Sequence, residues 1–549
     1  MKILMGLLVL VILLVGTVLS LPFLVDLNKY QDHYKPIIEE ALNRKVQLQD
    51  IRLTVWPRIG ARVSGFAVLD DPSFDSGPFA SLSSLDVGVK LMPLLSGQVE
   101  VEEVTLRHPV ITVIKNKNGV LNVSTIGRKG VPVPEAPSRA PIPSAEGPLK
   151  ILAMLAVDKV SIDGGKLIYR DQSVAKPTEY VLQDLELLLR DVRLGQTPNL
   201  HFASLVQPFN MPVKLDGTFG PLKDTMDLEA INFRLSVGKT DFAITGKAVD
   251  HNATVNVSSP VVNTANLPIA LPFKKPVEIK NLQIAAEVKG QEAKLNTLSF
   301  GLFDGEVKGS GKLVAGSDAP PFNGDVTIQG LQLGPALSTV AETPVSVSGT
   351  ADADLSVQGR GFSMPDLTKA LQGNGHLAVK DGKIQGVNLL REVVSALKVA
   401  GISIEDPNAT VFSTIETDLT IKQGVLSLRN LLMDSHDFQA TGGGTIGFDK
   451  QLNLLVNLNL SQEVSQKLSG ASPVVKVAMK DGRLSLPLTI TGTAQAPVYG
   501  VDVKGLTGKV QEQVKKKVEE AVGGLLKGTT KPEDLKKEGQ ELLKGLFGR

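Results

Sequence analysis

Histidines and paired carboxylates are the residues of this chain whose types could perform acid–base or metal chemistry. No two of the six histidines are spaced i, i+4, the spacing that brings two metal ligands to one face of a helix. Asp70 with Asp71, and Glu102 with Glu103, lie in turn-like or exposed contexts, where adjacent acids usually face water. Because no two histidines have this spacing, we interpret the six as surface residues: His33, His108, His201, His251, His376 and His436.

Two glycine-containing stretches imitate nucleotide-binding loops. "VGKT" at 237–240 resembles the end of a phosphate-binding loop, but Phe233 occupies the position where that loop needs its first glycine. "GNGHLA" at 373–378 leads from a helix-like segment into a strand, the reverse of a dinucleotide-binding site. We expect no catalytic, cofactor-binding or metal-binding residues and no enzymatic activity, although a weakly supported hydrolase stays an alternative.

Composition excludes further classes of function. The chain has 58 basic and 57 acidic residues, so a net charge of +1 gives no bulk attraction for nucleic acid, which we exclude as a partner. Aromatic residues make up 4% of the chain, too few for a platform that stacks bases or sugars. The absence of cysteine excludes disulfides and thiol catalysis.

Aliphatic residues at alternate positions are the dominant pattern. Successive side chains of a strand point to opposite faces of a sheet, so this pattern predicts strands with one apolar face. Polar residues, such as the asparagines of "KQLNLLVNLNLSQE" at 450–463, mostly fill the positions between. The predicted lining of an apolar groove is Leu452, Leu454, Val456, Leu458, Leu460, Leu484, Leu486, Leu488 and Ile490.

The N-terminal residues 3–25 contain no charged side chain. As a helix they would extend about 35 Å, enough to cross the hydrocarbon core of a bilayer. A cleaved signal peptide is the alternative, but its apolar region usually spans only about 7 to 15 residues. We predict a retained anchor with the bulk of the chain outside the cytoplasm.

Composition shifts divide the chain into five parts. Helical spacing predicts a short helix within 28–46 and another near 386–399, whereas strands dominate the rest. The predicted parts are a transmembrane anchor at 1–26, a β region at 27–127, a proline-rich linker at 128–148, an elongated β region at 149–504 and an amphipathic helical tail at 505–549.

The tail carries apolar stripes at helical spacing beside many lysines. One interpretation is that its helices cap an exposed strand edge of the sheet. The other is contact with a membrane or partner, in which lysines lie at anionic headgroups while apolar side chains enter the interface. The residues predicted for that contact are Leu542, Leu543, Leu546 and Phe547.

Residues 42–126 resemble the N-terminal region of the AsmA family. The resemblance is carried by "NRKV" at 43–46, "WPRIG" at 56–60, "PFASLSSLDV" at 78–87, "MPLLSGQV" at 92–99, "HPVITV" at 108–113 and "KNGVLN" at 117–122. Residues 371–393 and 420–448 are similar to the family's C-terminal region, and "LPLTITGTAQAPVYGVDV" at 486–503 resembles its closing strand. Residues 170–350 share only a general strand texture.

The resemblance implies a bacterial protein anchored once in the inner membrane, with most of its chain in the periplasm. It implies a long, curved sheet that forms a hydrophobic groove. Together with the residue patterns above, the predicted fold is mainly β: a transmembrane helix precedes an elongated, curved antiparallel sheet with a few helices, and the helical tail follows from its residues alone. The implied function is to bind or move glycerophospholipids between the inner and outer membranes and to support outer-membrane biogenesis. The implied partners are the inner membrane, phospholipid acyl chains and an outer-membrane or envelope protein. The alternative is a structural scaffold for envelope assembly without lipid transfer.

Overall fold

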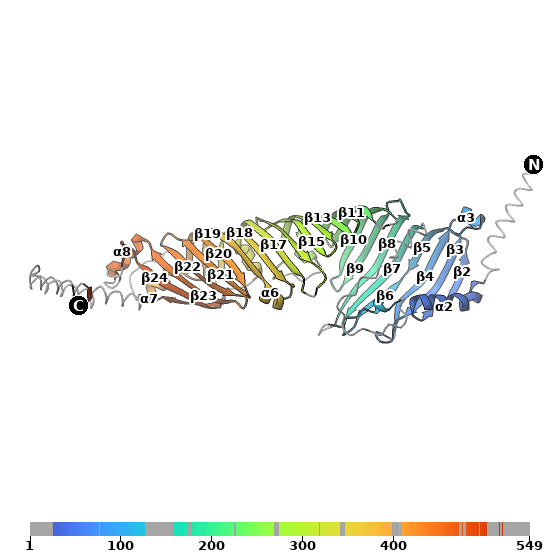
Figure 1. Cartoon of the computed structure of the whole chain (residues 1–549), viewed down its shortest axis with the longest axis horizontal. Helices are drawn as coiled ribbons and strands as arrows, with labels where there is room; N and C mark the ends of the chain where they lie inside the picture. The colour runs from blue at the N-terminus through green and yellow to red at the C-terminus, as the bar shows by residue number, and fades with distance from the viewer. Residues whose placement is uncertain are drawn as a thin grey trace, which may run out of the picture. The chain divides into compact units, whose positions relative to one another are not determined.

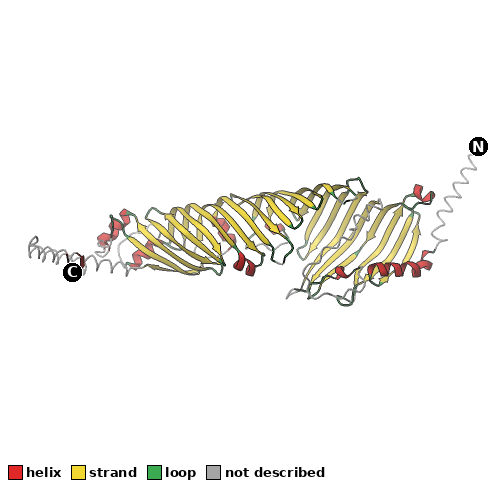
Figure 2. Ribbon diagram, in the orientation of Figure 1, coloured by secondary structure: helices red, strands yellow, loops and turns green. Residues whose placement is uncertain are grey.

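The structure is a computed structural model that describes residues 26–501, together with residues 515, 516 and 519. Within 26–501 it does not describe residues 57, 76, 127–156, 174–176, 224, 226, 268–273, 318, 341–345, 398–405, 407, 472–474, 476–478 and 494. The described part contains 25 strands and few helices, so the prediction of a mainly β fold is confirmed. Figure 1 labels these elements, and Figure 2 shows how strongly strands predominate.

Three of the five predicted parts lie almost entirely outside the described residues: the anchor at 1–26, the linker at 128–148 and the tail at 505–549. In the described portion of the chain, no helix is both long and apolar enough to cross a membrane. The anchor and the tail therefore stay predictions, as do the tail contacts at Leu542, Leu543, Leu546 and Phe547.

The chain divides into two compact units. The first unit comprises the described residues up to 270 and residues 282–290, and the second comprises the described residues of 271–281 and from 291 onward. Strand β14 (Glu278–Lys289) contributes residues to both units. Each unit is described separately below.

The first unit opens with short helices and continues as a sheet. Its helical elements are η1 (Leu27–Tyr30), α2 (Gln31–Leu42), α3 (Leu91–Leu95), η2 (Asn122–Thr125) and η3 (Thr264–Asn266). Its strands are β1 (Val46–Gln47), β2 (Asp50–Thr54), β3 (Gly60–Leu69), β4 (Pro78–Val89), β5 (Val101–Arg107), β6 (Val110–Lys115), β7 (Val157–Asp171), β8 (Thr178–Val192), β9 (Asn199–Gln207), β10 (Met211–Leu222), β11 (Leu228–Val237), β12 (Thr240–Val249) and β13 (Asn252–Asn263).

The strand pairings described for this unit are antiparallel except for two that involve β7. Both β5 and β6 pair with β7 in parallel, so the predicted antiparallel sheet is in fact mixed at this point. Parallel neighbours need a long connection between them, and β6 is followed by η2 and the undescribed residues 127–156 before β7 begins. The sheet therefore joins residues on both sides of the predicted linker.

The second unit is an antiparallel sheet in which strands that follow one another in sequence pair directly. Its strands are β15 (Glu292–Leu302), β16 (Gly305–Val314), β17 (Pro321–Gln332), β18 (Ser346–Arg360), β19 (Gln372–Gln385), β20 (Ala409–Lys422), β21 (Val425–Asp434), β22 (Phe438–Gly447), β23 (Gln451–Leu460), β24 (Ser485–Thr493) and β25 (Ala496–Val501). Its helices are α5 (Leu333–Val340), α6 (Met364–Ala370), α7 (Leu389–Ala396) and α8 (Gln462–Ala471).

Candidate functional site

One face of the first unit's sheet carries an unbroken row of apolar side chains. Residues directly opposite each other on paired strands share a face of the sheet. Cross-strand register therefore places these nine on one side, the apolar face of the unit: Val63, Leu85, Leu106, Ile162, Leu187, Phe202, Leu215, Leu235 and Phe242. All nine are half-buried, as expected where apolar side chains of one layer shield mainly each other.

The second unit has an equivalent apolar face. One register row crosses all eleven of its strands from β15 to β25 and contains only apolar side chains, glycine and one tyrosine. The row is Leu298, Gly309, Val326, Leu355, Gly375, Leu419, Leu428, Gly444, Leu454, Ile490 and Tyr499. Two of the predicted lining residues, Leu454 and Ile490, therefore belong to a continuous apolar surface.

Glycines in this row make room for the leucines beside them. A Cβ atom on Gly375 would lie 2.8 Å from Cδ2 of Leu355, and one on Gly444 would lie 2.9 Å from Cδ2 of Leu454. The same Cβ atoms would lie still closer to the backbone carbonyl oxygens of Asp354 and Asn453, respectively, so a side chain at either glycine would displace the neighbouring strand as well. Three glycines are thus interspersed among the larger apolar residues of the row.

The sheet of the second unit curves around α7 at its C-terminal end. Helix α7 contacts both β20 and β25. These two strands lie five strand spacings apart, or about 24 Å in a flat sheet, whereas eight helical residues extend only about 12 Å. Contact with both strands, together with the burial of α7 in one cluster with residues of β18 to β24, indicates a concave apolar face at this end.

Helices α7 and α8 seal the concave end into a closed core. On α7, Leu389, Leu390, Val393 and Val394 are buried in one cluster with strands β18 to β24, and Leu468 of α8 is fully buried in the same cluster. Tyr499 of β25 packs against this cluster. Burial raises the pKa of its phenol, and the nearby carboxylate Glu392 of α7 raises it further.

The nine predicted groove residues fall into two environments. Leu452, Leu454 and Ile490 are half-buried on the apolar face, and Ile490 also packs against the closed core. The other six lie in the closed core with no more than 4% of their surface exposed: Val456, Leu458, Leu460, Leu484, Leu486 and Leu488. The structure thus brings all nine to one region and covers six of them with protein. Their contact with lipid stays a prediction.

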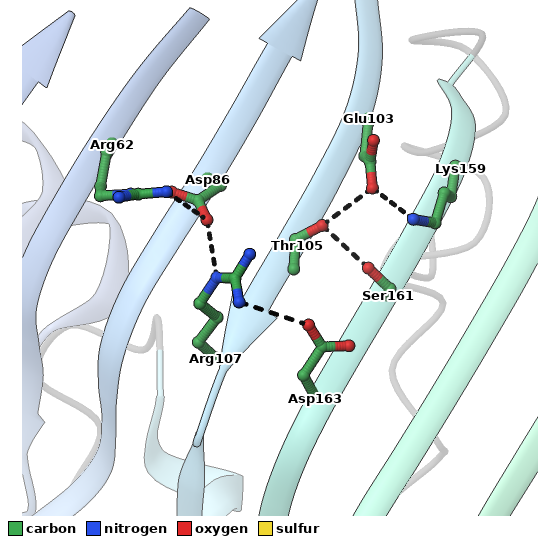
Figure 3. A network of polar contacts seen from close by, with 8 residues as sticks. All are labelled: Arg62, Asp86, Glu103, Thr105, Arg107, Lys159, Ser161 and Asp163. Carbon is green, nitrogen blue, oxygen red and sulfur yellow. Dashed lines mark hydrogen bonds and ion pairs between the residues drawn. The ribbon is translucent and has the colours of Figure 1, made fainter. Parts of the chain in front are cut away.

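The opposite face of the first unit is polar and carries ordered charges, as Figure 3 shows. Arg62 of β3 and Arg107 of β5 both donate to the Asp86 carboxylate on β4, and the Nε of Arg107 lies 2.9 Å from Oδ2 of Asp86. Across the parallel β5–β7 pair, Lys159 forms an ion pair with Glu103, and the hydroxyl oxygens of Thr105 and Ser161 lie 2.8 Å apart.

Asp86 is the shared anion of Arg62 and Arg107 in this network. Partial burial raises the pKa of its carboxyl group, but hydrogen bonds and charges from Arg62 and Arg107 outweigh burial and hold the pKa below its ordinary value. The hydrogen bond to Asp86 in turn raises the pKa of Arg62. Acidic and basic side chains of this network thus compensate each other across strands, while the apolar-face row carries no charge.

The motif-like glycines occupy ordinary sheet positions. Gly238 adopts a φ of +59° in the turn between β11 and β12, and Gly373 and Gly375 lie within β19. Across the described ranges, no three histidine, aspartate or glutamate side chains form a group that could hold a metal ion. The arrangement is suited to binding an extended apolar ligand along one face of a sheet.

The prediction from sequence omitted much of this surface. It named lining residues only in β23, β24 and the segment just before β24, although the apolar face of the first unit contains Phe202, Leu215 and Leu235. The alternation in "MPVKLDG" at 211–217 and "INFRLSV" at 231–237 was the available signal. It identifies strands, but cross-strand register was needed to show that their apolar faces are continuous.

Comparison with known proteins gives two matches. The model of the AsmA family matches residues 1–267 and 273–431. Protein AsmA of Escherichia coli (strain K12) is 23% identical over 219 residues, which cover 39% of this chain and 34% of that protein. The match therefore spans about a third of that relative's length. No solved structure matches the chain.

Proposed function

The chain belongs to the AsmA family, and from this membership and its one-sided sheets we propose that it is a membrane-associated envelope protein that binds and moves glycerophospholipids. Residues 1–26 would hold it in the inner membrane as a single-pass anchor, with the bulk of the chain in the periplasm. The acyl chains would lie on the apolar faces, and transfer would support outer-membrane biogenesis.

The observation that carries the proposal is the unbroken apolar row in each unit, which is half-buried at all nine positions of the first unit and at all positions except the buried Leu419 in the second. An acyl chain that covers these side chains gains about 0.8 kcal/mol for each methylene group removed from water. The lipid headgroup can stay in water at the margin of the sheet, so no polar site is needed to receive it. Binding of this kind discriminates little between headgroups.

A structural scaffold for envelope assembly is the second candidate. The observation that favours it is the closed core at the end of the second unit, where Leu458, Leu486 and Leu488 are fully buried. Such packing is typical of ordinary protein cores and needs no lipid. We also propose that the tail 505–549 either caps the sheet or contacts an outer-membrane or envelope partner.

Photo-crosslinking in cells distinguishes lipid binding from scaffolding. A photoreactive amino acid at Leu215 or Leu355, both half-buried on the apolar faces, should capture phospholipid that mass spectrometry identifies. The matched positions on the opposite faces are the exposed residues Lys214 and Gln358, which should capture none. A third probe at Leu486 tests whether lipid also enters the closed core.

Each outcome decides between the candidates. Lipid adducts restricted to the apolar-face probes support the proposal. Equal adducts at both sets, or adducts at neither set in a folded protein that still supports the envelope, contradict it and favour the scaffold. Capture at Leu486 would add the closed end to the lipid-binding surface.

A further inference from the structure

Five large apolar side chains are exposed together at one end of the strands in the first unit. We call them the edge patch: Trp56, Leu91, Met92, Leu95 and Val99, whose exposed fractions are 83%, 46%, 75%, 70% and 70%. Trp56 lies in the connection between β2 and β3, and the other four lie in the connection between β4 and β5. The two connections are neighbours, because the Val89 amide donates to the Ile59 carbonyl at 2.9 Å.

The composition of the edge patch differs from that of an ordinary surface loop. Residues 91–99, "LMPLLSGQV", contain no charged side chain. Helix α3 within them has no buried residue, and its side chains at Leu91, Met92 and Leu95 are exposed. A cluster of exposed apolar side chains on a soluble surface marks a site of contact with a partner or a membrane.

The patch lies on the edge where the chain enters the sheet. Asn28 of η1 is fixed to β2, because its side chain donates to Oδ1 of Asp50 at 2.8 Å and accepts from the Ile51 amide at 2.8 Å. Strand β2 then leads from Ile51 to Trp56 over about 17 Å. In Figure 1, α3 lies near β2 and β3 at the end of the unit where the chain begins, beyond the upper ends of the strands, whereas α2 runs along their lower ends.

We propose that the edge patch rests on the surface of the bilayer that holds the apolar run 3–25. The described chain begins at Asp26, two residues before Asn28, so an anchor ending there would hold the bilayer within about 30 Å of Trp56. Tryptophan and tyrosine favour the membrane interface, and Tyr30 of η1 is also 56% exposed on this edge. A bilayer therefore fits better than a protein partner or a second copy.

Contact at both the anchor and the edge patch would fix the tilt of the first unit against the membrane. The apolar row begins with Val63 on β3, the strand next to β2, so this tilt would place the start of the row beside the bilayer surface. The inference rests on the proposed anchoring, and it does not depend on lipid transfer.

Trp56 is the only tryptophan of the chain, so its fluorescence reports directly on the patch. The full chain is reconstituted into vesicles of phosphatidylethanolamine and phosphatidylglycerol, with or without brominated acyl chains, and vesicle flotation confirms anchoring. We expect the emission maximum of Trp56 to lie at a shorter wavelength than that of tryptophan in water. Brominated lipid should lower its emission intensity, whereas iodide in the aqueous phase should quench it little. The double substitution Met92→Gln and Leu95→Gln should weaken the quenching by brominated lipid without lowering thermal stability, because both side chains are exposed.

The matched control moves the tryptophan to the other end of the strands. In the double variant Trp56→Phe and Phe209→Trp, the only tryptophan lies in the turn between β9 and β10, where Phe209 is 43% exposed. Gly88 lies beside the patch, and cross-strand pairing connects it to Asn199 at the start of β9 through Glu103, Lys159 and Arg190. The start of β9 therefore lies at the same end of the strands as the patch. Phe209 lies beyond the far end of that strand, on the order of 30 Å away, so brominated lipid should not quench this variant.

Three results would overturn the inference. Iodide quenching of Trp56 without quenching by brominated lipid would place the patch in water. A blue shift without quenching by brominated lipid would indicate that protein covers it. A full chain that does not float with the vesicles would remove the anchoring premise as well, whereas the first two results in a floating chain leave the proposed lipid transfer untouched.

Discussion

Asp86 shows how single residues maintain the difference between the two faces of the sheet. Its carboxylate binds Arg62 and Arg107 on the strands to either side, and Arg107 also lies 3.9 Å from Asp163. The side chain of Asp86 is 22% exposed, whereas that of Asp163 is 53% exposed. Partly buried charge-assisted hydrogen bonds contribute more to stability than exposed ion pairs. We therefore attribute most of the stabilisation from this network to the hydrogen bonds of Asp86.

We predict that Asp86→Asn lowers the free energy of unfolding by about 1 to 3 kcal/mol, because two arginines lose their shared anion. Asp163→Asn is the matched control and should change it by less than about 0.5 kcal/mol. Chemical denaturation at pH 7 measures both values. Equal effects of the two substitutions would show that Asp86 has no special role.

The pH dependence of this effect follows from the lowered pKa of Asp86. A carboxyl group whose pKa is lower in the folded state stabilises the fold fully above its unfolded pKa, near 4, and loses that contribution as the pH falls toward its folded pKa. The stability difference between the wild-type protein and Asp86→Asn should therefore narrow as the pH falls from 7 to about 3. A gap that stays constant would contradict the charge-based explanation.

At the scale of elements, Asn388 fixes α7 against the sheet. Its side chain accepts from the Arg391 amide at 2.8 Å as the N-cap of the helix. The side-chain nitrogen Nδ2 of Asn388 donates to the backbone carbonyls of Asp406 at 2.7 Å and Ala409 at 2.8 Å. One buried side chain thus satisfies the start of α7 and joins it to the start of β20.

We predict that Asn388→Ala reduces the opening free energy of α7 by about 2 to 4 kcal/mol, through loss of the cap and of buried hydrogen bonds. Amide hydrogen exchange at Val393 to Ala396, beyond the first turn of α7, measures this local free energy. Ser363→Ala, which removes the exposed N-cap of α6, should cost that helix only about 1 kcal/mol. If both substitutions have the same local effect, the contacts of Asn388 with the sheet contribute little.

Local patterns predicted the elements better than their partners. Alternation predicted β23 and β24, and helical spacing predicted α7 with its buried Leu389, Leu390, Val393 and Val394. The same patterns did not reveal that α7 and α8 cover Leu458 and Leu486, because burial against a distant segment leaves alternation unchanged. The parallel pairing of β5 and β6 with β7 was also missed, since it joins residues across a connection of more than thirty residues.

At the scale of the whole molecule, the two apolar faces serve one function only if a lipid visits both. Leu187 and Leu235 lie in the row of the first unit, and Leu355 lies in the row of the second. If the proposed transfer follows a single path in chain order, a lipid passes Leu187, then Leu235, then Leu355; if the two faces load independently, it does not. A charge at Leu235 would interrupt such a path, because an acyl chain that covers an unpaired carboxylate must remove it from water at a cost of several kcal/mol, or about 10²-fold or more in occupancy.

We predict that Leu235→Asp, combined with photoreactive probes, reveals the order of loading. If lipid enters from the anchored end, the probe at Leu187 keeps its lipid adduct and the probe at Leu355 loses it. Entry from the other end reverses this result.

Asn232→Asp, an exposed position on the polar face of the same strand, is the matched control and should leave both adducts intact. Half-burial of Leu235 lets an aspartate there stay hydrated in the absence of lipid, so folding should survive, which circular dichroism checks. Adducts that persist at both probes in a folded Leu235→Asp protein would show that the two faces load independently, and a single path along the chain would be wrong.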